Sequence, residues 1–134
     1  DWSEPDTYSN DESTLEIEIA GGLTSISIID QSKSGLGYDL KGFSKEVTGY
    51  ITGSTDVFSD VQIESTKEFT CGSYKTIENV VLVTEKTTEM KMAICHLSIE
   101  TDSDYVQFIV MSTESNKDKV ISYAEGIGAT LTAL

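Results

Sequence analysis

The sequence predicts a single α+β domain in which helices cover both faces of an antiparallel sheet. Three patterns predict it: apolar and polar residues alternate in several short segments, two later segments are continuously apolar, and two others repeat with helical spacing. Alternation indicates a strand with one solvent-exposed face, whereas a continuous apolar run indicates a strand that is covered on both faces. We therefore expect an N-terminal hairpin, a helix, a four-stranded meander and a C-terminal helix, with six strands in the sheet.

The first third of the domain predicts the hairpin and the first helix. Residues 15–19 and 25–28 alternate between apolar and polar side chains on either side of a Gly-Gly turn, a pattern typical of a β-hairpin. From Leu36 to Ile51, apolar residues then recur at spacings of three, four and seven, which places them on one face of a helix. The helix contains several glycines, so we expect it to depend on packing against the sheet.

The rest of the chain predicts four strands and a second helix. Turn residues divide it into strands over residues 57–70, 74–85, 90–100 and 105–113. The first of these carries many charged residues, which is typical of an exposed sheet edge. Asn116 is the expected N-cap of a closing helix that we expect to run to the last residue. Its apolar stripe consists of Val120, Ala124, Ile127, Leu131 and Leu134.

The predicted register places the two cysteines and the single histidine. A tight turn at Thr87 and Thr88 sets Val80 opposite Cys95, and Asn79 opposite His96. Cys71 then lies out of reach of Cys95, because a disulfide needs Cα atoms within roughly 7 Å. We therefore expect two free thiols.

Charge excludes some classes of partner. The chain has 23 acidic residues against 9 lysines and no arginine, for a net charge of −14. Such a surface repels phosphate backbones and anionic lipid headgroups, so we expect no nucleic-acid partner. No segment approaches the ~20 consecutive apolar residues that a transmembrane helix needs.

The beginning of the chain suggests a compartment. Residues 1–13 are polar and acidic and do not start with Met, so we expect a flexible lead that follows a removed signal or anchor segment. The single domain would then occupy residues 14–134. This favours an extracellular or cell-surface bacterial protein with a possible lipid anchor upstream, although an intracellular tail is the alternative.

No recognisable catalytic or cofactor-binding arrangement is present. Any catalytic triad would need His96, which lies in the middle of a predicted strand, and the sequence has no Gly-x-Ser-x-Gly elbow or phosphate-binding glycine pattern. Two acidic pairs, Asp56 with Asp60 and Asp102 with Asp104, are weak calcium candidates, because turns select Asp for backbone hydrogen bonds. We expect no enzyme activity and no cofactor.

The order of the elements resembles a known family. The segment Phe69–Lys75, the long apolar strands after it and the helix from Val120 to Leu134 are similar to the PsbP/Mog1-like α/β/α sandwich, which exported bacterial lipoproteins also use. This resemblance covers residues 15–134 and carries over no functional residue. Members of the family act mostly as binding or assembly modules, so the resemblance implies such a role by fold analogy.

Three functions follow as hypotheses. We favour a non-catalytic exported or surface-tethered domain that binds a protein or a cell-envelope component. The alternative is a small-ligand-binding domain with a pocket between the first helix and the sheet, near Tyr38, Tyr50 and His96. An enzyme that uses His96 is the third hypothesis, and a polar residue paired across the sheet is the simpler role for that histidine.

Overall fold

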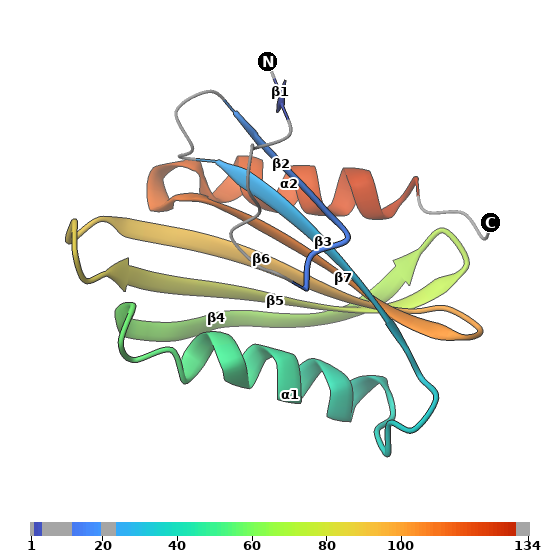
Figure 1. Cartoon of the computed structure of the whole chain (residues 1–134). Coiled ribbons are helices and arrows are strands. Elements are labelled where there is room, and N and C mark those ends of the chain that lie inside the picture. The colour runs from blue at the N-terminus through green and yellow to red at the C-terminus, as the bar shows by residue number, and fades with distance from the viewer. Residues whose placement is uncertain (1, 4–11, 20–23, 131–134) are drawn as a thin grey trace.

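The computed structural model describes residues 2–3, 12–19 and 24–130, which form one sheet with a helix on each face (Figure 1). The strands are β1 (Trp2–Ser3), β2 (Leu15–Ile19), β3 (Ser25–Ser32), β4 (Phe58–Cys71), β5 (Tyr74–Glu85), β6 (Lys91–Glu100) and β7 (Asp104–Thr113). The helices are α1 (Leu40–Thr52) and α2 (Lys117–Gly128), with a short 3₁₀ turn at Glu114–Asn116 before α2.

The sheet has the predicted α+β topology. Its strand order is β1-β2-β3-β7-β6-β5-β4, and every neighbouring pair is antiparallel. The four strands β4 to β7 form the predicted meander, and the β2–β3 hairpin joins them because β3 pairs with β7. Beyond the six predicted strands, Trp2 and Ser3 form the two-residue β1, which pairs with Ile19 and Glu18.

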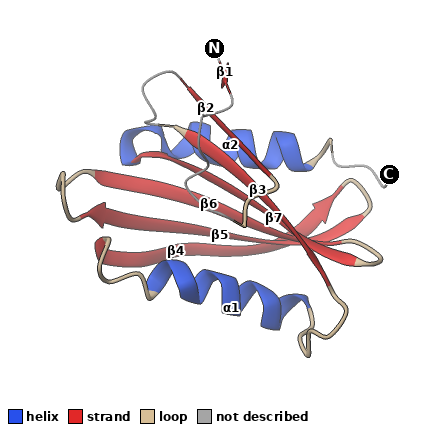
Figure 2. Cartoon of the chain, viewed as in Figure 1, coloured by secondary structure: helices blue, strands red, loops and turns tan. Residues whose placement is uncertain are grey.

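Each helix covers a different part of the sheet, as the ribbon shows (Figure 2). α2 packs on β6 and β7, whereas α1 lies on the other face, over β4, β5 and β6. Adjacent residues of β5 show why the strand is apolar throughout: Val80 joins the core under α2, and Val81 joins the core on the α1 face. The prediction of a strand covered on both faces is confirmed for β5, whereas α1 leaves part of β7 uncovered on its face of the sheet.

Helix α1 starts later than the sequence pattern indicated. Asp39 is its N-cap and accepts a hydrogen bond from the amide of Gly42 at 2.8 Å. Leu36 still packs against the α1 core, but it does so from a turn in which Gly35 has a φ of 81°. Leu36 therefore matched the apolar spacing of the helix although it lies before the N-cap. From the loop, its side chain packs where a residue of a longer helix would pack.

Helix α2 ends earlier than predicted. Its last residue is Gly128, and Thr130 closes the end by donating its hydroxyl to the carbonyl of Ile127 at 2.7 Å. Leu131 and Leu134 lie outside the described residues. At the other end, Asn116 occupies the N-cap position, but its side chain makes no cap hydrogen bond. It donates instead to the hydroxyls of Ser112 and Thr113.

The predicted register is confirmed. Val80 lies opposite Cys95, and Asn79 lies opposite His96. Cys71 and Cys95 are both buried and free, as expected. Cys71 also explains one glycine of α2, because a Cβ on Gly128 would lie 2.8 Å from the Cys71 sulfur.

Candidate functional site

Two grooves lie along the two sides of α1, and a third of about 630 Å³ lies at the N-terminal end of the helix. The first, which we call the α1–β4 groove, has a volume of about 520 Å³ and lies between the helix and the edge strand. Gly49 and Thr52 form part of its helix wall, Ile63 lies on its strand side and Ile77 is at its base. Lys41 and Glu68 form an ion pair of 3.2 Å between the two sides.

The second groove, the α1–β3 groove, has a volume of about 550 Å³ and lies on the other side of the helix. It forms because α1 covers β4, β5 and β6 and leaves β3 and part of β7 uncovered on this face. The helix contributes Tyr50 and Ile51, while the sheet contributes Ser27, Gln107 and Ile109.

A set of buried polar side chains, which we call the polar belt, lies under α1 between the two grooves. Its members are Ser44, Thr48, Asn79, His96, Ser98 and Gln107. The Asn79 amide donates to Ser44 at 2.9 Å and to Thr48 at 3.1 Å, which fastens the helix to β5. Asn79 lines the α1–β4 groove and Gln107 lines the α1–β3 groove, so the belt reaches both.

His96 lies at the centre of the polar belt and is completely buried. Its Nε2 donates to the Gln107 side-chain oxygen at 2.9 Å, and its Nδ1 has no hydrogen-bond partner. Burial lowers the pKa of the imidazole below its ordinary value of 6.5, which keeps the ring neutral at neutral pH. The ring is therefore a packed core group that bonds to Gln107.

We expect the substitution His96→Ala to act on stability. It removes a fully buried ring and leaves the Gln107 oxygen without its donor, so the free energy of unfolding should fall by about 2–4 kcal/mol. Urea unfolding followed by circular dichroism measures the change. An unfolding midpoint equal to that of the parent would show that the ring is not packed as described.

The structure does not bring the three predicted ligand residues together. Tyr38 precedes α1, and its carbonyl accepts the hydroxyl of Tyr105 at 2.9 Å. Tyr50 lies near the other end of the helix, twelve residues away, which corresponds to about 18 Å at about 1.5 Å per residue. Of these three residues, only Tyr50 lines the α1–β3 groove. His96 is connected to that groove through its hydrogen bond with Gln107.

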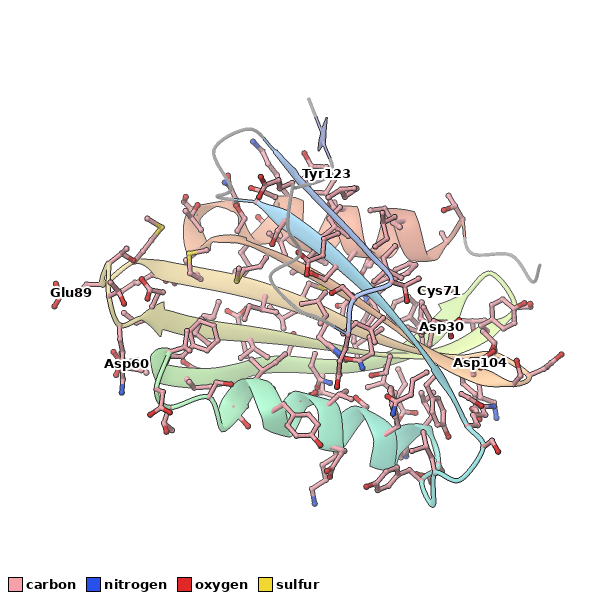
Figure 3. The ribbon with its side chains drawn as sticks, in the orientation of Figure 1. Asp30, Asp60, Cys71, Glu89, Asp104 and Tyr123 are labelled. Atoms are coloured by element: carbon pink, nitrogen blue, oxygen red, sulfur yellow. The ribbon has the colours of Figure 1, made fainter. Side chains whose placement is uncertain are left out.

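The acidic pairs considered for calcium do not form a cluster. Asp60 and Asp104 lie at opposite ends of the sheet (Figure 3). Asp60 has a φ of 50° beside an irregularity in β4, and Asp104 accepts the hydroxyl of Ser103 in the last hairpin turn. Among the described residues, no group of three or more His, Cys, Asp or Glu side chains is placed to hold a metal ion.

The α2 face carries a charged cluster that sequence reasoning missed. Glu78 on β5 is only 4% exposed, and Lys67 on β4 lies 3.9 Å from it. The same lysine makes a closer ion pair of 2.5 Å with Glu125 on α2. Burial and the neighbouring Glu125 raise the pKa of Glu78 from 4.5 to about 7. The sequence did contain a signal for this cluster: Glu78 lies within a strand that was expected to be covered on both faces, where a carboxylate needs a partner.

Comparison with known proteins supports the fold. No family model matches the chain, and no curated protein matches its sequence. Among solved structures, cyanobacterial PsbP (CyanoP) from Synechocystis sp. PCC 6803 superposes with a TM-score of 0.68 at 12% identity, over 99% of this chain and 82% of that protein. The chain has a PsbP-like fold.

A second solved structure is similar over most of its length. It is the protein of unknown function PA94 from Pseudomonas aeruginosa, described as a putative regulator. The TM-score is 0.63 at 10% identity, and the match covers 97% of this chain and 88% of that one. Identities this low establish shared architecture, so the resemblance predicted from element order is confirmed for the fold.

No helix within the described part of the chain combines the length and apolarity needed to cross a bilayer.

Proposed function

We propose that this chain is a non-catalytic binding domain whose partner is a protein at the bacterial cell envelope. The observation that carries the proposal is an exposed apolar side chain on the edge strand β4. Ile63 is 48% exposed and lines the α1–β4 groove. Exposed apolar side chains next to a groove are typical of interaction sites, whereas isolated ones are not. We call Ile63 and the groove wall at Gly49 and Thr52 the β4 corner.

The edge of the sheet adds hydrogen-bonding capacity to this corner. β4 has 14 residues, and among the described strands it pairs with β5 alone, so its other side presents backbone donors and acceptors. Glu64 and Glu68 form ion pairs with Lys117 of α2 and Lys41 of α1, which places charge on both sides of the edge. A partner would therefore meet apolar contact at the corner within a charged rim, the common anatomy of protein interfaces.

The chemically reactive side chains support a non-catalytic role. His96 is buried and bonded to Gln107. Burial raises the pKa of both thiols, Cys71 and Cys95, which disfavours the nucleophilic thiolate. Neither this histidine nor either cysteine lies in the α1–β4 or the α1–β3 groove.

Export and a lipid anchor upstream belong to the same proposal. The acidic residues 1–13 and the net charge of −14 suit a tethered domain that stays soluble above an anionic surface. CyanoP and PA94 share the fold, and PA94 is described as a putative regulator of unknown function. Their identities of 10% and 12% carry no partner over to this chain.

Site-specific photo-crosslinking in the source cells tests the proposal. A photoreactive phenylalanine analogue replaces Ile63 in the complete gene product, and the control replaces Ser122, which is exposed on α2 on the opposite face. Cells are fractionated before the adducts are analysed. We expect envelope fractionation and a discrete protein adduct from position 63 alone. Equal adducts from both positions, or a cytoplasmic protein, would contradict the proposal.

A further inference from the structure

We propose that the α1–β3 groove is a binding site for a small amphipathic cation, a molecule with an apolar body and a single positive head. This site is distinct from the β4 corner, since it lies on the other side of α1. Its volume of about 550 Å³ falls within the range of roughly 300–1,000 Å³ typical of small-molecule sites.

The apolar part of the ligand has a matching surface. Ile29, Ile109 and Met111 line the groove from β3 and β7. Phe58 and Ile51 close it near the end of α1. An alkyl chain or ring placed on these side chains would leave water, which is the main favourable contribution to binding of this kind.

Polar side chains line the same groove. Gln107 is only 7% exposed, and its side-chain oxygen accepts a hydrogen bond from His96. Ser25 and Ser27 of β3 add hydroxyl-bearing side chains to the lining. A few polar groups in a mostly apolar pocket serve to orient a bound ligand.

Charge selects a cation. None of the groove-lining residues is a lysine, and Glu12 lies at the rim. Glu18 and Glu16 of β2 lie opposite Ser25 and Ser27 of β3, and residues directly opposite each other share a face. These three residues are acidic, in a chain of net charge −14, so the groove should repel an anion and attract a cation.

Tyr50 supplies a second contact for a positive head. Its side chain lines the groove from α1 and is 69% exposed, so the ring is accessible. An aromatic face attracts ammonium groups, and the attraction increases when the contact excludes water. Tyr50 is not a member of the core clusters under α1, so a role in ligand binding would explain why a large aromatic side chain lies exposed there.

A series of matched probes tests the ligand class. Octyltrimethylammonium, octyl glucoside and octyl sulfate share one alkyl chain and differ in head charge, and each is titrated below its micelle concentration by isothermal calorimetry. We expect the cation to bind most tightly, the neutral glucoside more weakly, and the sulfate not at all. Equal binding of all three, or tightest binding of the sulfate, would overturn the proposal.

Variants test the location. Ser27→Phe places a ring in the groove without changing charge and should abolish binding, whereas Ser122→Phe on α2 should leave it unchanged. Tyr50→Ser alters an exposed residue and should weaken binding of the cation by about two- to fivefold while the glucoside is unaffected. A Ser27→Phe protein that binds the cation as the parent does would show that the probe associates with the acidic surface in general, and that result would overturn the site.

Discussion

Substitution of Val120 by Asp should unfold most of the protein or reduce its free energy of unfolding by more than about 4 kcal/mol. Val120 is 1% exposed and packs from α2 into the core between the helix and the sheet. A carboxylate there loses its hydration and meets only apolar neighbours. Because typical domains are stable by roughly 5–15 kcal/mol, the change removes a large part of the total. Urea unfolding followed by circular dichroism measures it.

Ser122→Asp is the matched control. Ser122 lies in the same helix but is exposed, so the same added charge should change stability by less than about 0.5 kcal/mol. If both variants unfold at the same urea concentration, α2 is not docked on the sheet in the way the structure shows. Ile127, also on the predicted stripe, is only partly buried and would give a smaller effect.

The strands and their register were predictable because local patterns specify them. Alternation of apolar and polar residues identified β2 and β3. The continuous apolar run in β5 identified a strand covered on both faces of the sheet. The turn at Thr87 and Thr88 then fixed the pairing of Asn79 with His96, since a hairpin sets the register of both its strands.

The helix ends were not predictable from apolar spacing alone. Leu36 packs on the α1 core from a loop, so its spacing matched a helix that begins only after Asp39. At α2, the close approach of Gly128 to Cys71 is a tertiary contact that no local pattern encodes. The pairing of β1 with β2 joins segments separated by residues 4–14, and a two-residue strand has no recognisable period.

The candidate site was predictable only in outline. The sequence placed a pocket beside the first helix, and Tyr50 does line a groove there. It could not show that α1 leaves β3 uncovered, or that Tyr38 lies at the far end of the helix. Those facts depend on where α1 crosses the sheet, which is set by Phe43 and Val47 packing on Ile77 and Tyr105.

Stability should depend on pH through Glu78. Burial and the neighbouring Glu125 raise its pKa in the folded state from 4.5 to about 7, so the fold favours the protonated carboxyl. A group with a raised pKa contributes stability that is complete below its ordinary pKa of 4.5 and is lost as pH rises through about 7. Three groups from neighbouring elements face it: Lys67 of β4, Glu125 of α2 and Cys95 of β6.

Two other groups act in the opposite direction. The ion pair with Lys67 lowers the pKa of Glu125, so its contribution is present above its ordinary value of 4.5 and is lost as pH falls below that value. Burial lowers the pKa of His96, and its contribution is lost as pH falls below about 6.5. The measured pH profile is therefore a sum of opposing slopes, and a variant is needed to isolate Glu78.

Glu78→Gln isolates that contribution. The amide cannot ionise, so at pH 8 the variant should be more stable than the parent, by up to about 3 kcal/mol for a pKa raised by this amount. At pH 4.5 the two proteins should be nearly equal, because the parent carboxyl is then mostly protonated in the fold. Urea unfolding of both proteins from pH 4.5 to 8 measures the difference, and Glu46→Gln, at an exposed position of α1, controls for the loss of one surface carboxylate. A Glu78→Gln protein that is less stable at pH 8 would mean that the charged carboxylate is held by its contact with Lys67, and that the pKa of Glu78 is not raised.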